Sequence, residues 1–213
     1  LFLVSGVFAQ DAHGLLAKLD NIMFAPKDKQ GIVSIILIDK DGEEKAREAE
    51  MLQKGRDKKL YRYTKPEKQA GIATLSMPDG VMWLYMPAFG NPKKVTLLAK
   101  SQAFTGTDFS YEDMATEPWS DRFFPRLVET KDDVYILELT PRGDKSSYSK
   151  VIVTQEKTNF YPIKMEYYDK GGKKFKESTY TYEKIGNYWN AAEVIMKNLK
   201  KEHSTKLQLK DVV

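Results

Sequence analysis

Three acidic residues, Asp108, Glu112 and Asp113, lie close together in the sequence among glycine and hydroxyl residues. Two neighbouring carboxylates can act as a general acid and a general base, as they do in glycoside hydrolysis. The same stretch also fits a capping box, with Ser110 as N-cap and Asp113 three residues later, which predicts a short helix that begins at Tyr111. Because capping accounts for Asp113 and no nucleophile or metal ligand lies nearby in the sequence, we expect no catalytic residue in this group.

Other common chemistries lack the residues that they need. The chain contains no Cys, which excludes disulfides, thiolate metal sites and a cysteine nucleophile. Its two His residues, His13 and His203, are far apart, and a metal site needs more ligands than they and scattered carboxylates offer. Gly171 and Gly172 belong to a hairpin-turn sequence and not to a phosphate-binding loop. We therefore predict a protein that is not an enzyme and that uses neither a metal nor a cofactor.

The composition is that of a globular protein with a sizeable core, since 41% of its 213 residues are hydrophobic. The 34 Lys and Arg residues and the 30 Asp and Glu residues leave a formal charge of +4, and the basic residues are dispersed along the chain. Nucleic-acid binding requires a clustered positive surface, so we expect no nucleic-acid partner.

The first residues, LFLVSGVFAQDA, are typical of the apolar end of a secretory signal peptide. Ala9 ends a cleavage pattern, which predicts a signal remnant over 1–9 and one domain over 10–213. A buried N-terminal strand is the alternative, because short apolar runs are ambiguous. After residue 12 no stretch approaches the roughly 20 apolar residues of a membrane span, and no Cys offers a site for a lipid anchor. We expect an exported, soluble protein that does not span a membrane.

One amphipathic helix is expected to precede a series of strands. Residues 12–24 place apolar side chains at helical spacing, and Pro26 ends the pattern. Turn signals such as Pro78-Asp79-Gly80 then separate short segments rich in β-branched and aromatic residues. The predicted strands of antiparallel hairpins are 31–38, 44–54, 58–64, 71–77, 81–87, 93–98, 126–130, 134–140, 148–156, 162–168, 174–184, 188–199 and 204–213.

The long connection between Leu98 and Arg126 interrupts this pattern of strands and tight turns. Its aromatic side chains are too apolar to remain in water, so the connection is expected to cover another part of the protein. We predict an α+β fold: a strongly curved antiparallel sheet, an incomplete β-barrel, whose concave face is covered by the N-terminal helix and by a helical or loop lid over 99–125. The aromatic-rich layer of this lid consists of Phe104, Phe109, Tyr111, Met114, Trp119, Phe123 and Phe124.

The stretch Trp83–Pro87, followed by a basic strand and then by FTGTDFSYED at 104–113, resembles the outer-membrane lipoprotein-sorting (LolA-like) family of bacterial periplasmic proteins. Further pieces extend the resemblance over nearly the whole chain: Leu19–Met23, Lys54-Gly55, Tyr61–Tyr63, Pro66 and Met165–Asp169. Family members continue beyond the point where this chain ends, which is within a predicted strand at Val213.

The resemblance implies a periplasmic carrier, a chaperone-like transport protein that binds the acyl chains of lipoproteins or other amphiphiles in a hydrophobic cavity. It would transfer them towards the outer membrane, and it would work with an inner-membrane transporter and an outer-membrane acceptor. It also implies that a strand Arg near the cavity mouth holds the lid, which makes Arg47 a latch residue here. A surface ion pair is the alternative role of Arg47.

Flexible Met and abundant aromatic side chains suit a pocket that accepts chains of variable shape. Alternation places Trp83 and Tyr85 on one face of their strand and Met82 on the other, and we expect the Trp83 face to line the cavity. The expected cavity and lid residues are Trp83, Tyr85, Met51, Leu97, Phe104, Phe109, Tyr111 and Met114.

A second function remains open at this point. Met and aromatic residues in strands commonly pack a filled core, and the protein would then be a non-enzymatic accessory or adaptor domain of a membrane transporter with no cargo of its own. A periplasmic hydrolase is disfavoured because the sequence offers no credible nucleophile.

Overall fold

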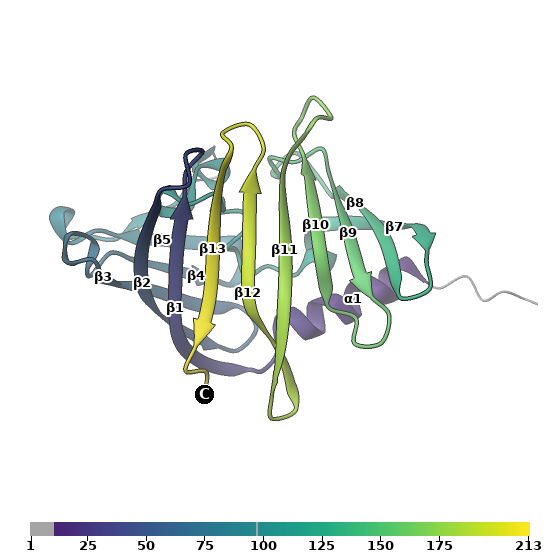
Figure 1. The fold of residues 1–213 in the computed structure, drawn as a ribbon, viewed down its shortest axis with the longest axis horizontal. Helices are drawn as coiled ribbons and strands as arrows, with labels where there is room; N and C mark the ends of the chain where they lie inside the picture. Colours follow the sequence, from purple (N-terminus) through teal and green to yellow (C-terminus); the bar gives the residue numbers. More distant parts are fainter. Residues whose placement is uncertain (1–10, 97) are drawn as a thin grey trace, which may run out of the picture.

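The computed structural model describes residues 11–96 and 98–213, and the fold is mostly β. In this part of the chain, thirteen strands form one antiparallel sheet in the order β6-β5-β4-β3-β2-β1-β13-β12-β11-β10-β9-β8-β7, with two short helices, α1 and α2 (Figure 1). The predicted antiparallel sheet and N-terminal helix are confirmed. The predicted signal remnant at 1–9 lies outside the described residues.

The strands follow the turn signals of the sequence closely, although in the described part of the segment 93–98, predicted as one strand, only Lys93 and Lys94 are strand residues. In chain order the strands are β1 (Asp28–Ile38), β2 (Glu44–Lys54), β3 (Lys58–Lys65), β4 (Ala73–Met77), β5 (Val81–Tyr85), β6 (Lys93–Lys94), β7 (Phe123–Thr130), β8 (Val134–Pro141), β9 (Lys150–Glu156), β10 (Pro162–Tyr168), β11 (Lys174–Ile185), β12 (Tyr188–Asn198) and β13 (His203–Lys210).

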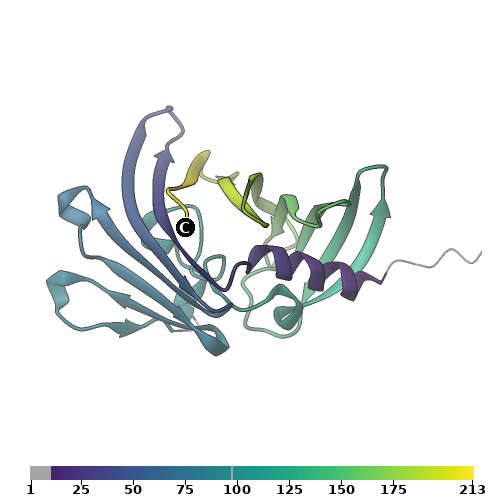
Figure 2. The ribbon, with the colours of Figure 1, turned by 90° about the horizontal axis from the view of Figure 1, so that it is seen from below.

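Strands that follow each other in the chain pair with each other, except for β6 and β7, so the sheet consists of two meanders that meet where β1 pairs with β13. At this junction Val33 lies opposite Leu209, and Val213 exchanges two backbone hydrogen bonds with Gln30. Strands β6 and β7 form the two outer edges of the sheet. Figure 2 shows that both ends of the sheet turn towards the side on which α1 lies.

Helix α1 (Ala12–Met23) begins after Asp11, whose side chain accepts hydrogen bonds from two N–H groups of the first turn at 3.0 and 3.2 Å. The helix ends before Pro26, as the sequence predicts, and it contacts α2 (Trp119–Arg122), β7 and β12. Its buried apolar face consists of Leu15, Leu16 and Leu19.

The core lies on the inner side of the sheet in two clusters. The larger cluster joins the leucines of α1 and Met82 of β5 to apolar side chains of β7 to β10 and β12, and to the aromatic residues that follow β6. The smaller cluster belongs to the other half of the sheet and consists of Val33, Ile35, Leu37, Ala49, Met51 and Tyr63. Members of both clusters line the site described next.

Candidate functional site

The connection between β6 and α2 folds against the inner side of the sheet. It contains two short 3₁₀ turns, η4 (Leu98–Ser101) and η5 (Phe104–Gly106), and is otherwise irregular. We call residues 98–118 the covering segment. Its aromatic residues Phe104, Phe109 and Tyr111 are at most 7% exposed and belong to the larger core cluster. The predicted burial of this aromatic layer is therefore confirmed for these three residues.

The predicted C-terminal boundary of the lid, at residue 125, is wrong. Strand β7 begins at Phe123, so residues 123–125 belong to the sheet and not to a lid. Alternation along β7 buries Phe123 completely and leaves Phe124 50% exposed, where the Arg142 guanidinium stacks over its ring at 4.0 Å.

The first of three carboxylates that fasten the covering segment is Asp108. Its Oδ2 is hydrogen-bonded to His203 Nδ1 at 2.6 Å and accepts a hydrogen bond from the Thr205 hydroxyl at 2.7 Å. The backbone N–H of Asp108 in turn donates to the Thr205 hydroxyl at 2.9 Å. These bonds hold the covering segment to β13. Nothing in the sequence indicated that Asp108 contacts this strand.

Glu112 is the second carboxylate, and its residue is buried. It accepts hydrogen bonds from the Ser146 hydroxyl at 2.5 Å, the Ser147 hydroxyl at 2.6 Å and the Ser147 N–H at 2.9 Å. These donors lie in the loop between β8 and β9, so Glu112 holds the segment to the far half of the sheet.

Asp113 is the third carboxylate and forms the predicted capping box with Ser110. Its Oδ2 accepts from the Ser110 N–H at 2.7 Å, and its own N–H donates to the Ser110 hydroxyl at 3.2 Å. The reciprocal bonds are as predicted, but a hydrogen-bonded turn and not a helix follows, so the predicted helix at Tyr111 is wrong. Asp113 also has a second set of partners, in β11 and in the loop before β9.

These partners form a buried charge cluster. The Lys176 ammonium of β11 pairs with Asp113 Oδ2, both side chains are 4% exposed, and the Tyr148 hydroxyl donates to Asp113 Oδ1 at 2.6 Å. Burial alone would raise the pKa of Asp113, but the Lys176 charge and the hydrogen bonds outweigh it and hold this pKa below its usual value. Burial and the nearby negative charges of Asp113 and Glu112 raise the pKa of Tyr148 well above its usual value. The three acidic residues therefore bind three separate sets of structural partners.

On the other half of the sheet, Arg47 of β2 contacts the tip of the covering segment. Its Nη1 donates to the backbone carbonyl of Thr105 at 2.6 Å, and the Tyr63 hydroxyl of β3 is hydrogen-bonded to the Thr105 hydroxyl. Thr105 has a φ of 47°, in the left-handed region that β-branched residues rarely adopt. Arg47 therefore binds the segment, as the latch role requires, and forms no ion pair among the described residues.

Asp20 joins α1 to the end of the covering segment. Its carboxylate is buried in α1 and accepts hydrogen bonds from the N–H groups of Trp119 at 2.8 Å and Ser120 at 3.0 Å, at the start of α2. Helix α1 and the covering segment thus form one continuous layer against the sheet. Asp20 was missed in the sequence because its partners lie about a hundred positions away.

Between this layer and the sheet lies a cavity of about 190 Å³. Its wall comes from α1, the covering segment, β1 to β3 and β10 to β13, and it is mostly apolar or aromatic. The apolar and aromatic lining residues are Ile22, Met23, Phe24, Ala25, Val33, Met51, Tyr61, Phe109, Met114, Ala115, Trp119, Tyr167, Tyr180, Tyr182, Trp189, Ala191, Val194, Leu207 and Leu209.

The polar residues of the wall are Lys29, Lys59, Asp113 and Asn190. The tyrosines of the wall are uncharged, because burial raises the pKa of Tyr61, Tyr180 and Tyr182. The wall thus offers neutral aromatic surface with a few charged positions.

Several residues expected in the cavity lie there. Met51, Phe109 and Met114 line it, and Phe104 lines a small hollow beside it. Tyr111 is buried and packs edge to face against Phe104 at a centroid distance of 5.4 Å, but it is not among the described residues that line either space. Leu97, also expected in the cavity, lies outside the described residues.

The expected orientation of strand β5 is wrong. Met82 is 1% exposed and belongs to the core, whereas Trp83 is 37% exposed and points to the outer face. Tyr85 lies two residues from Trp83 and shares its face, and neither is among the described residues that line the cavity. The sequence VMWLYM is apolar at every position, so alternation showed which residues share a face but not which face is buried.

The wall residues from α1 and from β10 to β13 were missed in the sequence. They include Trp189, which lies near the start of β12, and Tyr180 and Tyr182, which alternate along β11. Alternating tyrosines are a signal of one shared face, but they occur equally on outer faces of sheets.

A second hollow, of about 310 Å³, lies beside α2 and the loop after β8. Eight of its twelve lining residues are charged, so it does not suit an acyl chain. Among the described residues, no group of three or more His, Asp or Glu side chains could hold a metal ion. No helix in the same part of the chain has the length and apolar character needed to cross a membrane.

The fold and its cavity have counterparts among solved structures. A domain named for outer membrane lipoprotein sorting, from Vibrio parahaemolyticus, is 26% identical and matches with a TM-score of 0.85 over 95% of this chain and 91% of that one. A LolA superfamily protein from Nitrosomonas europaea is 28% identical and matches with a TM-score of 0.80 over 94% of this chain and 92% of that one.

A DUF1329 family protein from Desulfovibrio piger has the same fold, with a TM-score of 0.86 and 22% identity over 94% of this chain and 90% of that one. No curated protein matches the chain. A family model with the description "Uncharacterized protein" matches residues 55–213. The chain belongs to the family of this model and to the LolA-like structural family of outer membrane lipoprotein-sorting domains.

Proposed function

We propose that the protein is a carrier that binds the acyl chains of lipoproteins or other amphiphiles in the cavity between the sheet and the layer of α1 and the covering segment. The observation that carries this proposal is the apolar and aromatic wall of the cavity, which surrounds about 190 Å³ of space. The names of the relatives from Vibrio parahaemolyticus and Nitrosomonas europaea support the same class of function.

In this proposal the bent sheet acts as an incomplete β-barrel, and the cavity must widen when cargo enters. Its volume of about 190 Å³ is below the roughly 300–1,000 Å³ that is usual for sites of drug-sized ligands. Each methylene group transferred from water contributes about 0.8 kcal/mol, so a long acyl chain supplies enough free energy to displace part of the wall. The covering segment is the part that can move without disrupting the sheet.

The contacts of the covering segment suggest how it opens. On the side of β11 and β13 it is held by the carboxylates of Asp108 and Asp113, and the second of these forms a buried ion pair. On the side of β2 and β3 it is held by Arg47 and Tyr63 at Thr105, without any carboxylate. We expect the tip at Thr105 to leave β2 and β3 first, because an uncompensated buried charge is more costly than a lost hydrogen bond.

The proposed carrier works in the periplasm after export, receives its cargo from an inner-membrane transporter and delivers it to an acceptor at the outer membrane. The LolA-like fold supports this location and these partners, and the name of the relative from Vibrio parahaemolyticus mentions outer membrane lipoprotein sorting. The chemistry of the cavity requires only that cargo have an acyl chain.

Binding of a neutral naphthalene-type probe, N-phenyl-1-naphthylamine, tests the proposal. We expect probe fluorescence to rise on binding with near one-to-one stoichiometry, and a long-chain lipid to displace the probe. Organic extraction of protein purified from its own periplasm, followed by mass spectrometry, should yield a lipid in similar stoichiometry. A folded protein that neither binds the probe nor carries lipid would contradict the carrier function.

One observation favours the alternative, an accessory domain of a membrane transporter without cargo. On the outer face of the sheet, Leu52, Leu60, Leu75 and Trp83 lie side by side in register across β2 to β5. Leu52 is 41% exposed and Trp83 is 37% exposed, so this row is available to a partner protein. Probe binding distinguishes the two functions, because an adaptor with a filled core binds no probe.

A further inference from the structure

Two lysines lie in one row on the inner side of the sheet. Lys29 of β1 is opposite Gln53 of β2, and Gln53 is opposite Lys59 of β3. Neighbouring strands are about 4.8 Å apart, so the Cα atoms of the two lysines are separated by roughly 10 Å. Both side chains line the cavity.

Neither lysine has a carboxylate partner. The ion pairs among the described residues include neither Lys29 nor Lys59. Lys29 Nζ donates to Asn190 Oδ1 at 3.1 Å, which is a neutral partner. Burial, with the Lys29 charge as a second cause, lowers the pKa of Lys59 to about 8, and burial also lowers the pKa of Lys29. The protein thus keeps two poorly solvated cations in the wall of an apolar cavity.

The other polar groups of the wall do not neutralise them. Asp113 is the one carboxylate among the described lining residues, and it is already paired with Lys176. Gln53 lies between the lysines and donates through Nε2 to the carbonyls of Phe24 and Pro26. Its Oε1 is buried and has no hydrogen-bond partner in the described part of the chain. The cavity wall at Lys29 and Lys59 therefore carries two positive charges without a carboxylate partner among the described residues.

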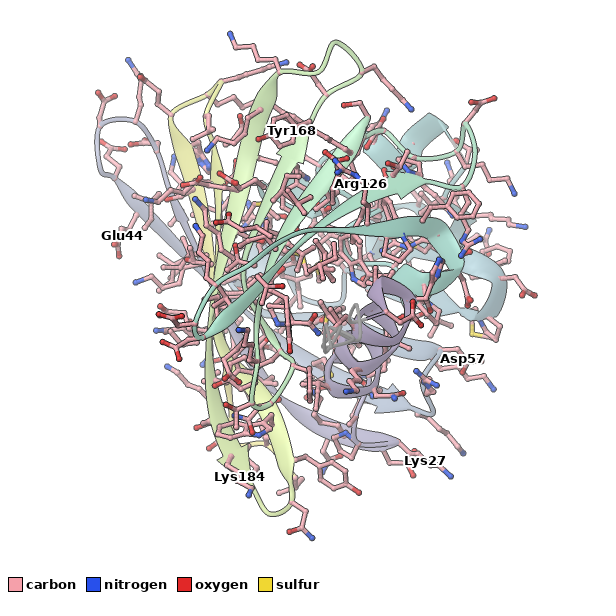
Figure 3. All side chains as sticks on the ribbon, turned by 90° about the vertical axis from the view of Figure 1, so that its right-hand side faces the viewer. Lys27, Glu44, Asp57, Arg126, Tyr168 and Lys184 are labelled. Atoms are coloured by element: carbon pink, nitrogen blue, oxygen red, sulfur yellow. The ribbon has the colours of Figure 1, made fainter. Side chains whose placement is uncertain are left out.

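The surface at this end of the molecule carries charges of both signs. Figure 3 shows Lys27, just before β1, and Lys184, near the end of β11, both at the lower end of the molecule. Both side chains are exposed. The exposed carboxylates Asp28 and Glu183 are the sequence neighbours of these two lysines, so the charge that favours an anion is that of Lys29 and Lys59 in the cavity wall.

We infer that the cavity takes an amphiphile with an anionic head group, a carboxylate or a phosphate monoester, which Lys29 and Lys59 bind while the acyl chain packs against the apolar wall. This inference rests on the proposed carrier function and specifies its class of cargo. Buried charges in proteins are normally paired, and an anion placed between the two ammonium groups supplies the missing partner. Hydrogen bonds to charged groups predict a preference of roughly 10–100-fold for the anion over a neutral amphiphile of equal chain length.

A competition experiment tests the inference. Protein loaded with N-phenyl-1-naphthylamine is titrated with hexadecanoate and with hexadecanol, and separately with hexadecanoyl lysophosphatidate and with monohexadecanoylglycerol. The first pair tests a carboxylate and the second a phosphate, each against a neutral compound of the same chain. The proteins are the wild type, Lys29→Met, Lys59→Met and the double variant. Lys58→Met is the matched control, because Lys58 is the exposed neighbour of Lys59 on the same strand.

We expect the wild type and Lys58→Met to prefer at least one of the anions by roughly tenfold or more. Each single variant should lose part of this preference and the double variant all of it, while the neutral compounds keep their affinity. Met retains most of the apolar length of Lys, so the probe itself should still bind.

Two failures are distinguishable. If the neutral compounds displace the probe but the preference is absent in the wild type or unchanged in the double variant, the inference is wrong and the carrier function stands. If the wild type binds neither the probe nor any of the four amphiphiles, the carrier function itself fails. The anion that gives the larger preference identifies the head group as carboxylate or phosphate.

Discussion

Arg47 and Thr105 connect the sheet to the tip of the covering segment through a hydrogen bond of 2.6 Å from the guanidinium to the backbone carbonyl. The two residues are 58 positions apart in the chain, so the bond links elements that are distant in the sequence. Thr105 keeps a φ of 47° in spite of its branched side chain, which the surrounding contacts must stabilise. These contacts hold the covering segment in one position, and loss of the bond between Arg47 and Thr105 would release its tip.

Replacing Arg47 by Met should release the tip. We expect probe association to become several-fold faster, because the segment opens more often, and the free energy of unfolding to fall by about 1–3 kcal/mol, because a charged hydrogen bond is lost. Stopped-flow fluorescence and urea unfolding measure the two effects.

The matched control is Arg62→Met, because Arg62 is an exposed arginine of the neighbouring strand that pairs with Glu50. It should leave the association rate unchanged and cost at most about 1 kcal/mol. Equal association rates for Arg47→Met and the wild type would show that Thr105 is not the point of release.

The buried pair of Asp113 and Lys176 should be costly to break. Asp113→Asn leaves the Lys176 ammonium buried without its partner, and we expect a loss of about 3–5 kcal/mol in the free energy of unfolding. Adding Lys176→Met to Asp113→Asn should recover part of this loss, since the uncompensated charge is then gone. Urea unfolding of the two single variants and the double variant gives the coupling energy.

Glu50→Gln is the control for this cycle, because the ion pair of Glu50 with Arg62 is exposed and should contribute no more than about 1 kcal/mol. If Asp113→Asn cost as little as Glu50→Gln, the cluster of Asp113, Lys176 and Tyr148 would not fasten the covering segment.

Lys59 should make stability depend on pH in the alkaline range. Its pKa is about 8 in the folded protein against 10.5 without burial, so between these values the unfolded chain binds more protons than the folded one. Stability from this group therefore rises with pH from about 8 to about 10.5, and the cost of burying the charge is fully present below pH 8. Lys59→Met removes that cost and should stabilise the protein at pH 7 by about 2 kcal/mol, less than the full shift implies because the side chain is partly exposed.

The measurement is the difference in unfolding free energy between Lys59→Met and the wild type at several pH values from 7 to 10. Buried tyrosines also titrate abnormally in this range, but their contribution cancels in the difference. The difference in unfolding free energy should decrease as the pH rises. A difference in unfolding free energy that stays constant or increases with pH would mean that Lys59 is not a desolvated cation in the free protein.

The sequence predicts those features of this fold that depend on neighbouring residues. Turn signals locate the hairpins, and the spacing of Ser110 and Asp113 predicts the reciprocal capping bonds that the structure contains. A turn and not a helix follows them, and the same carboxylate also binds Lys176 and Tyr148. Their positions, 63 and 35 residues later, have no local signal.

The residues that line the cavity also depend on strand pairing, which has no local signal in the sequence. Lys58 and Lys59 are identical neighbours in the sequence, and only the pairing of Gln53 with Lys59 places the second one on the inner side. Trp83 was expected on the inner side, but its strand is apolar at every position, so alternation did not show which face is buried. The register of β4 and β5 pairs Trp83 with Leu75 on the outer face and Met82 with buried Ser76 on the inner one. Hydrophobicity alone does not show which face of this strand is buried.

The three Trp residues offer a direct test of the cavity assignment. Trp119 and Trp189 line the cavity, whereas Trp83 is on the outer face and 37% exposed. Cargo that fills the cavity should change the surroundings of Trp119 and Trp189 and leave those of Trp83 unchanged. We therefore expect Trp83→Phe to retain the change in tryptophan emission when hexadecanoate is added, and Trp189→Phe to lose a large part of it.

Binding must also be measured by a signal that does not depend on tryptophan, such as displacement of the naphthalene probe. This control distinguishes a loss of the change in tryptophan emission from a loss of binding. Trp189 donates a hydrogen bond to Asn159 at 3.1 Å and contacts Tyr161, so Trp189→Phe should reduce stability as well, and its melting temperature is measured beside the wild type. Cargo should raise the melting temperature of every variant that binds it, by mass action. Loss of the emission change in Trp83→Phe, with binding intact, would place the cargo against the outer face and overturn the cavity described here.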